Sequence, residues 1–183
     1  ENAAILEEVK RQADRVNHSV SDVLKYSRKK ELDLDMNDIN DTIRSIVLFL
    51  EGQMKGKEID ISVTLEDELP LFCFDNKQLE EVLLNLGLNA MQAIEKKGSI
   101  AFSSMYEKDS EKIVITVSDT GKGIDENDLS SIFHPFFTTK SEGTGLGLAI
   151  VKDVIEKHEG EIWAENREEG GCMFTIELPV KTG

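Results

Sequence analysis

Three glycines at alternate positions, Gly143, Gly145 and Gly147, lead directly into an apolar stretch with helical spacing. Glycine adopts positive φ without strain and lets a ligand approach the backbone closely. The first turn of a helix also carries unpaired N–H groups and the positive end of the helix dipole. The segment therefore suits a polyanion such as phosphate, although its spacing fits neither G-x-G-x-x-G nor G-x-x-x-x-G-K-[ST]. A flexible hinge is the alternative.

Asn85 and Asn89 stand four residues apart in an otherwise apolar helical stretch, so their side chains share one helix face. Buried carboxamides need hydrogen-bond partners. A carboxamide oxygen is also a suitable neutral ligand for Mg²⁺, which keeps several waters and shares the phosphates of a nucleotide. The pair therefore indicates a magnesium site, and the alternative is an asparagine that caps a neighbouring loop.

An aspartate followed by glycines, Asp119-Thr120-Gly121-Lys122-Gly123, closes an expected strand. The carboxylate can accept a hydrogen bond from an exocyclic amine such as that of adenine, and the glycines let the backbone fold beneath a flat ligand. A simple Asp–Gly turn is the alternative. Further along, residues 132–140 are rich in phenylalanine, which we expect to anchor the base of a mobile segment. Lys140 ends that segment where its ammonium could reach a terminal phosphate.

In this order and spacing, the four motifs closely resemble the ATP-binding domain of sensor histidine kinases, within the superfamily of gyrase, MutL and related ATPases. The resemblance covers about residues 32–180 and implies the Bergerat ATP-binding fold, with ATP or ADP as the nucleotide. It further implies Mg²⁺ at Asn89 with Asn85 nearby, the adenine amine at Asp119, and a phosphate lid that includes Lys140. Thr175 would touch the adenine side through water. The implied nucleotide-binding set is Asn85, Asn89, Asp119, Gly121, Gly123, Ile124, Phe136, Lys140, Gly143, Thr144, Gly145, Leu146, Gly147 and Thr175.

Asn85 stands where the ATP-hydrolysing relatives carry a glutamate that acts as general base. Asparagine takes no proton at neutral pH, whereas a neutral imidazole already offers a lone pair. The resemblance therefore implies phosphoryl transfer to histidine in preference to rapid hydrolysis, with Asn85 and Lys140 at the reacting phosphate. Gln92 stands where many relatives carry Lys or Arg. The family's phosphoacceptor box surrounds none of the histidines of this chain, which are His18, His134 and His158.

Hydrophobic periodicity divides the chain into two parts. Residues 1–30 have apolar side chains at heptad spacing and resemble the second helix of the family's dimerisation and phosphoacceptor hairpin. This implies one long N-terminal helix and a homodimer formed through it. Residues 31–183 form the expected ATP-binding catalytic domain, an α/β (α+β) two-layer sandwich of a mixed, mostly antiparallel sheet with helices on one face.

Within the second part, alternating residues predict short strands, and segments with helical period follow capping residues. The strands are expected at about 31–36, 59–65, 99–106, 112–118, 161–166 and 172–178. Helices are expected from a cap at Asn37 or Asp38, from Asp75 to a stop at Gly98, near 126–131, and from the glycine loop to about His158. Pro70 and Phe72 are placed in a connection.

The chain has 183 residues and a formal net charge of −15. So acidic a chain is a poor match for nucleic acid, and a phosphate ligand would need a divalent cation and well-placed lysines. No apolar run approaches the ~20 residues that span a bilayer, and no leader is visible. We therefore expect a cytoplasmic, soluble domain without direct membrane contact, or a soluble piece of a larger and membrane-anchored parent. Cys73 and Cys172 are expected as core or near-core thiols.

The sequence thus predicts the catalytic region of a dimeric sensor histidine kinase, a protein-histidine kinase that binds Mg·ATP. It would pass the γ-phosphoryl group to a histidine outside this chain, for relay to an aspartate on a response-regulator receiver domain. The chain alone is not expected to phosphorylate itself. An ATP-gated interaction module and a gyrase-like ATPase remain the alternatives.

Overall fold

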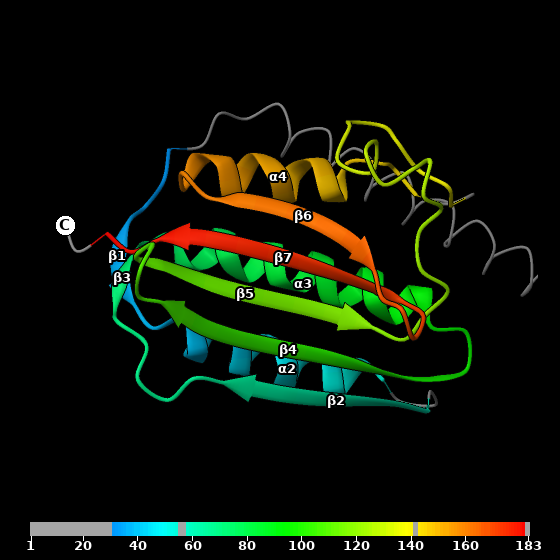
Figure 1. Cartoon of the computed structure of the whole chain (residues 1–183), viewed down its shortest axis with the longest axis horizontal. Coiled ribbons are helices and arrows are strands. Elements are labelled where there is room, and N and C mark those ends of the chain that lie inside the picture. Colours follow the sequence, from blue (N-terminus) through cyan, green and yellow to red (C-terminus); the bar gives the residue numbers. More distant parts are fainter. Residues whose placement is uncertain (1–30, 55–57, 141–142, 182–183) are drawn as a thin grey trace, which may run out of the picture.

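The computed structural model describes residues 31–54, 58–140 and 143–181. The helix predicted for residues 1–30 lies outside the described residues. Within them, a five-stranded sheet is covered on one face by helices (Figure 1). Its strand order is β2-β4-β5-β7-β6, with β2 and β4 parallel and the other neighbours antiparallel. The predicted two-layer sandwich with a mixed, mostly antiparallel sheet is confirmed.

The elements of this sandwich have the following bounds. The sheet consists of β2 (Glu58–Leu65), β4 (Lys97–Glu107), β5 (Lys112–Asp119), β6 (Glu161–Asn166) and β7 (Cys172–Pro179). The helices are α2 (Ile39–Gln53), α3 (Asn76–Ala93) and α4 (Gly147–Lys157). A separate antiparallel pair is formed by β1 (Asp35–Asn37) and β3 (Phe72–Phe74).

Strand β5 shows how alternation places a functional side chain. Successive side chains of a strand point to opposite faces, and Ile113, Ile115 and Val117 are buried in the hydrophobic core beneath the helices. Asp119 is the next member of that row and is also buried. The strand therefore ends by directing a carboxylate to the helix-covered face of the sheet.

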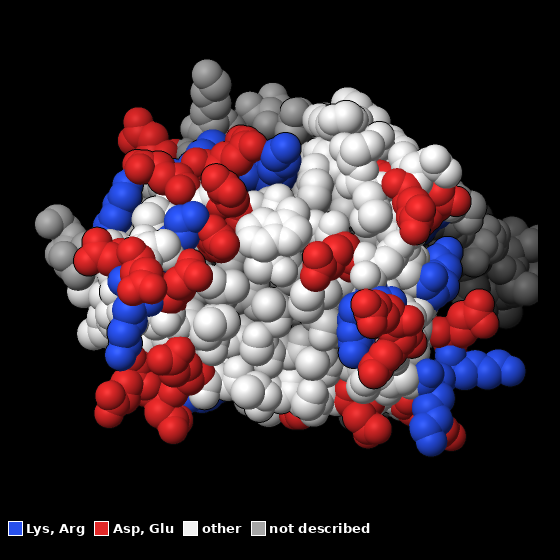
Figure 2. Space-filling view, in the orientation of Figure 1, with Lys and Arg blue, Asp and Glu red and all other residues white. Residues whose placement is uncertain are grey.

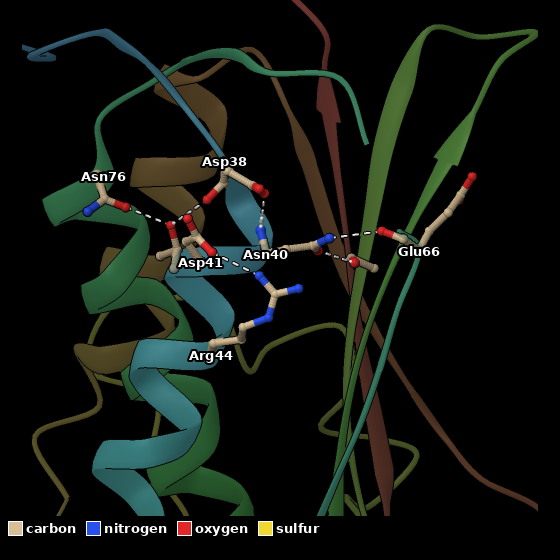
Figure 3. A network of polar contacts seen from close by, with 8 residues as sticks. Asp38, Asn40, Asp41, Arg44, Glu66 and Asn76 are labelled. Carbon is tan, nitrogen blue, oxygen red and sulfur yellow. Dashed lines mark hydrogen bonds and ion pairs between the residues drawn. The ribbon is translucent and has the colours of Figure 1, made fainter. Parts of the chain in front are cut away.

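A buried polar network fixes α2 to both the sheet and α3 (Figure 3). The side chain of Asp38 caps α2 by accepting a hydrogen bond from the Asn40 amide at 2.8 Å. The Asn40 carboxamide donates to the Glu66 carbonyl at 2.9 Å and accepts from the Ser104 hydroxyl at 2.6 Å. Two residues after Asn40, the Thr42 hydroxyl donates to Oδ1 of Asn76, the first residue of α3, at 2.6 Å. Each buried polar group thus has a partner, as burial demands.

Helix α3 is capped by Asp75, whose side chain accepts from the Gln78 amide at 3.0 Å. The backbone amide of Asp75 in turn donates to Nε2 of His158 at 3.1 Å. Since Nε2 accepts, the other ring nitrogen carries the proton and donates to the Val154 carbonyl at 2.8 Å. Burial lowers the pKa of His158, opposed by the Val154 hydrogen bond and by Asp75. The neutral ring therefore links the end of α4 to the start of α3.

Several expected boundaries were wrong. Residues 126–131 form successive turns in place of a helix, although the Asp125 side chain accepts from the Asn127 amide as an N-cap would. Helix α3 ends at Ala93, and Gly98 lies inside β4. Phe72 belongs to β3, which pairs with β1, and β1 is shorter than the 31–36 expected. These differences lie at element ends and leave the layer architecture unchanged.

The other face of the sheet is uncovered in the described part of the chain. Figure 2 shows this face, with charged side chains gathered toward the two ends of the strands and a largely uncharged centre. Trp163 and Met105 are among its exposed apolar residues. In the part of the chain that the structure describes, no helix is both long and apolar enough to cross a bilayer.

Candidate functional site

The C-terminal half of α3 brings the asparagine pair together with the end of the phenylalanine-rich segment. Nζ of Lys140 donates to Oδ1 of Asn89 at 2.9 Å and to Oε1 of Gln92 at 2.6 Å. One turn earlier, Nδ2 of Asn85 donates to the Glu81 carbonyl at 2.9 Å. The two asparagines and Gln92 thus form a row of carboxamides along one side of α3. The Lys140 ammonium is bound to two of them, Asn89 and Gln92.

The glycine loop meets the same helix at its first carboxamide. Gly147 is the first residue of α4, and a Cβ built there would lie 3.2 Å from Oδ1 of Asn85. Leu146 occupies the N-cap position and supplies no side-chain cap. A helix start without a side-chain cap leaves backbone N–H groups for another acceptor, and it carries the positive end of the dipole. The geometry therefore places an anion-attracting helix terminus beside Asn85.

The Asp-x-Gly-x-Gly turn packs against the last residue of α3. A Cβ on Gly121 would lie 2.6 Å from the carbonyl oxygen of Ala93, and the Lys122 amide donates to that oxygen at 3.3 Å. Gly123 has φ of +72° and lies against Asn166. The glycines are therefore required for the close packing of this turn. All four motifs converge on the C-terminal half of α3.

Asn166 is a residue of this turn that sequence reasoning missed. Its Oδ1 accepts from the amide of Ile124 at 2.8 Å, and its Nδ2 donates to the Ile124 carbonyl at 2.6 Å. The side chain therefore pairs with the backbone as another strand would, and it holds the 119–124 turn against the end of β6. Nothing in the local sequence marks this asparagine, because the contact spans 42 residues.

Asp119 is 3% exposed and accepts hydrogen bonds from the backbone amides of Gly121 and Cys172. Burial raises the pKa of this carboxyl, and the two amide hydrogen bonds and Arg167 oppose the rise. The guanidinium of Arg167 donates to the Asp119 backbone carbonyl at 3.1 Å. An ionised carboxylate can accept about four hydrogen bonds, so this group has capacity left for an amine donor.

Thr175 and Cys172 lie on opposite faces of β7, and the adenine-side position expected for Thr175 does not agree with this. Thr175 alternates with the core residues Phe174 and Ile176, so its side chain points to the uncovered face of the sheet, away from Asp119. Cys172 lies beside Asp119 instead, where burial, and then the negative charge of Asp119, raises the pKa of its thiol to about 12. That thiol therefore stays protonated at neutral pH, and it packs beside Asp119 as a neutral group. Cys172 is buried, Cys73 is half-buried, and both are free, as expected.

The phenylalanine-rich segment is held by two of its rings and by its backbone. Phe133 packs edge-on against Phe174 with ring centroids 6.3 Å apart, and Phe137 packs against the core. Phe136 differs, because its side chain is 66% exposed and its backbone has φ of +68°. Its amide donates to the Gly145 carbonyl at 2.9 Å, and Gly145 itself has φ of +68°. The segment is therefore joined to the glycine loop through backbone contacts.

The remaining loop residues are tied to each other. The amide of Leu146 donates to the Thr144 hydroxyl at 3.4 Å, and Leu146 is buried. The amide of Gly143 donates to the Lys140 carbonyl at 3.3 Å. Burial lowers the pKa of Lys140, and the nearby charge of Lys122 lowers it further. Two lysines thus create a positive spot beside the carboxamide row.

The side chains present fit a magnesium nucleotide. The carboxamide oxygens are hard, neutral ligands, which suits a cation that is shared with phosphates. No group of three or more His, Cys, Asp and Glu within residues 31–54, 58–140 and 143–181 is arranged to hold a metal. Asp119 offers a buried acceptor and α4 offers a helix N-terminus. A separate small pocket, at the other end of α4 near His158 and Cys73, takes no part in this arrangement.

Comparisons with known proteins identify the family of this domain. The family model described as histidine kinase-, DNA gyrase B- and HSP90-like ATPase matches residues 74–182, and the chain belongs to this family. Among curated relatives, the sensor histidine kinase ZraS of Salmonella typhimurium is 40% identical over 170 residues, which cover 93% of this chain and 36% of ZraS. The histidine-protein kinase AtoS of Escherichia coli is 33% identical over 172 residues, covering 94% and 28% of the two chains.

Solved structures give the same class. The catalytic domain of histidine kinase ThkA superposes with a TM-score of 0.73 at 35% identity, covering 81% of this chain and 99% of that one. Full-length ShkA in complex with AMPPNP gives a TM-score of 0.86 at 25% identity, covering 99% and 39%. The chain contains a sensor histidine kinase ATPase catalytic domain. The chain spans about a third of the length of ZraS and of AtoS.

Proposed function

We propose that this domain binds Mg·ATP at the C-terminal half of α3 and donates the γ-phosphoryl group to a histidine. The observation that carries the proposal is the convergence of four separate motifs there, with the Lys140 ammonium bonded to Oδ1 of Asn89. The adenine amine would bond to Asp119, with Gly121, Gly123 and Ile124 forming that end of the pocket. The phosphates would lie near Lys140 and the N-terminus of α4.

Asn89, with Asn85 nearby, would hold Mg²⁺, which supplies neutralisation of the phosphate charge. Phosphoryl transfer would then depend mainly on positioning the γ-phosphate and the acceptor histidine, and on stabilising the charge of the transferred group. Asn85 offers an amide where a base would otherwise stand, and this favours a histidine acceptor, which brings its own lone pair. A solved structure of ThkA with the response regulator TrrA is 31% identical, has a TM-score of 0.79, and covers 94% of this chain and 49% of that one. By analogy we propose a response-regulator receiver domain as the final acceptor.

Several parts of the proposal concern residues outside the described ones or the whole protein. Residues 1–30 would be the second helix of the dimerisation hairpin and residues 31–183 the catalytic domain. The homodimer would form through that helix, and the domain would work in the cytoplasm, without nucleic acid or direct membrane contact. No histidine of this chain has the acceptor context, so the phosphoacceptor lies on another segment.

Calorimetry with Mg·ATP tests the binding step. Asn89→Ala is expected to remove detectable binding, because the metal loses a protein oxygen and Lys140 loses a partner. Gln53→Ala, on the last turn of α2, is a matched loss of an exposed carboxamide and should bind as the wild type does. Asp119→Asn should reduce the preference for ATP over GTP. Equal binding by Asn89→Ala and wild type would contradict the metal assignment.

A transfer assay separates the candidate functions. A helical hairpin that carries a phosphoacceptor histidine is added with Mg·ATP, and acid-labile phosphate on the hairpin is measured. Transfer supports the kinase. Binding without transfer or hydrolysis supports an ATP-gated interaction module, which Asn85 allows equally. Steady phosphate release without an acceptor would support a gyrase-like ATPase. Acid-labile phosphate on His18 of the chain itself would contradict the assignment of the acceptor to another segment.

A further inference from the structure

Gln92 and Asn89 hold one ammonium group between them. They are three residues apart on α3 and therefore neighbours on its surface, and Lys140 reaches them from 48 and 51 residues away. The bond to Gln92 is the shorter of the two, at 2.6 Å against 2.9 Å. Both acceptors are neutral carboxamide oxygens, so the bonds fix the ammonium without cancelling its charge.

Asn89 has two competing tasks if the proposed function is correct. Its Oδ1 is the expected magnesium ligand, and it is also the acceptor for Lys140. A divalent cation and an ammonium on the same oxygen repel each other. Asn89 must therefore exchange the lysine for the metal when the nucleotide enters. Gln92 has no such conflict, since it lies one turn nearer the end of the helix.

We infer that Gln92 is a positioning residue that keeps the Lys140 ammonium at the phosphates when Asn89 takes the metal. This inference rests on the proposed function, and it assigns a role to a side chain outside the predicted binding set. Without Gln92, the Lys140 ammonium would keep only the Asn89 oxygen of these two acceptors, and it would lose that oxygen on metal binding. The lysine would then be free to leave the site, and its charge would contribute less to nucleotide affinity.

A double-mutant cycle on Mg·ATP affinity tests this coupling. Gln92→Met removes the acceptor and keeps the side-chain volume. It is expected to weaken binding about three- to tenfold, the effect of losing one hydrogen bond of ordinary strength, because this bond is exposed to solvent. In a Lys140→Met background the same change should alter affinity less than about twofold. Gln92→Lys in that background should recover affinity, because it brings a cation to the same place. Gln53→Met and Lys108→Met, at exposed positions outside the predicted binding set, are the matched controls.

A second measurement needs no nucleotide. The rate at which an amine-acylating reagent labels Lys140, read by mass spectrometry, should rise at least about threefold in Gln92→Met, because a side-chain acceptor is lost. It should stay unchanged in Gln53→Met. Equal effects of Gln92→Met in both lysine backgrounds would overturn the inference while wild-type binding still supports the proposed function. Unchanged labelling would also overturn it. If the wild type binds no Mg·ATP, the proposed function fails first and the inference fails with it.

Discussion

Alanine at Gly171 tests how the Asp119 end of the site is built. Gly170 and Gly171 are adjacent in the β6–β7 turn and both have positive φ, +94° and +87°. A Cβ on Gly171 would lie 1.9 Å from the carbonyl oxygen of Asp119, whereas a Cβ on Gly170 would meet no atom within 4 Å. Alanine at position 170 therefore measures the backbone conformation alone, and alanine at 171 adds a collision with the end of β5.

The magnitudes of the two substitutions differ accordingly. A left-handed backbone costs an alanine roughly 1–2 kcal/mol relative to glycine, so Gly170→Ala should lower the free energy of unfolding by that amount. At Gly171 the Asp119 carbonyl must retreat by at least about 1 Å before an ordinary contact is possible, and such overpacking adds about 1–3 kcal/mol. The expected loss for Gly171→Ala is therefore roughly 2–5 kcal/mol.

Equilibrium urea unfolding of both variants measures these losses. Gly52→Ala in α2, where a Cβ meets open space, is a third variant and should be stabilising by about 0.5–1 kcal/mol. Mg·ATP affinity should fall in Gly171→Ala and not in Gly170→Ala, because the displaced carbonyl belongs to Asp119. Equal losses of stability at positions 170 and 171 would refute the close packing of the turn on β5.

Three further predictions follow from other parts of the molecule. Burial lowers the pKa of His158 below its ordinary 6.5, so the unfolded chain takes up the proton at a higher pH than the folded chain, and the free energy of unfolding falls as pH drops through 6.5. Urea midpoints should therefore fall more between pH 7.5 and 5.5 in the wild type than in His158→Gln, and an equal fall in both would contradict this. Ser104→Ala leaves Oδ1 of the buried Asn40 without its hydroxyl donor and should cost about 1–3 kcal/mol of unfolding free energy, against almost nothing for the exposed Ser110→Ala. Asn85→Glu supplies a general base where the amide stands, so the rate of phosphate release from ATP without an acceptor should rise by at least about 10-fold, less than the roughly 10²–10⁴ that a well-placed base contributes. An unchanged rate in a variant that still binds Mg·ATP would argue against a reacting phosphate near Asn85.

Local sequence was sufficient for the motifs and for most elements. Period-two and helical spacing located the sheet strands and the three described helices, because one face of each is buried in a single core. The convergence of the motifs also followed, since the resemblance carried the tertiary arrangement with it. Thr175 was a miss that local sequence could have prevented. Its neighbours Phe174, Ile176 and Leu178 form a core row, which sends Thr175 to the other face.

Other misses needed the tertiary structure. Strand β3 has only three residues and is defined by its pairing with β1, so its hydrophobic periodicity is too short to predict it. Cys172 lies beside Asp119 because β5 and β7 are antiparallel neighbours in this register. The sequence of either strand alone does not predict the register. Gln92 was identified as a departure from the family pattern, but its bond to Lys140 spans 48 residues. Long-range contacts of this kind depend on the assembled fold.

The chemistry of the proposed site would let so acidic a chain bind phosphate. With a net charge of −15, carboxylates around Lys140 would neutralise it and repel the ligand. The side chains that hold its ammonium are carboxamides instead, which accept hydrogen bonds and add no negative charge. The other groups proposed to face the nucleotide are backbone amides at the start of α4 and in the glycine turns. Asp119 is buried, and the proposal assigns its carboxylate to the adenine side, where an acceptor is needed and a phosphate is not. In the proposed binding mode, carboxamides and backbone amides contact the ligand without adding negative charge, so net charge alone could not have located this site.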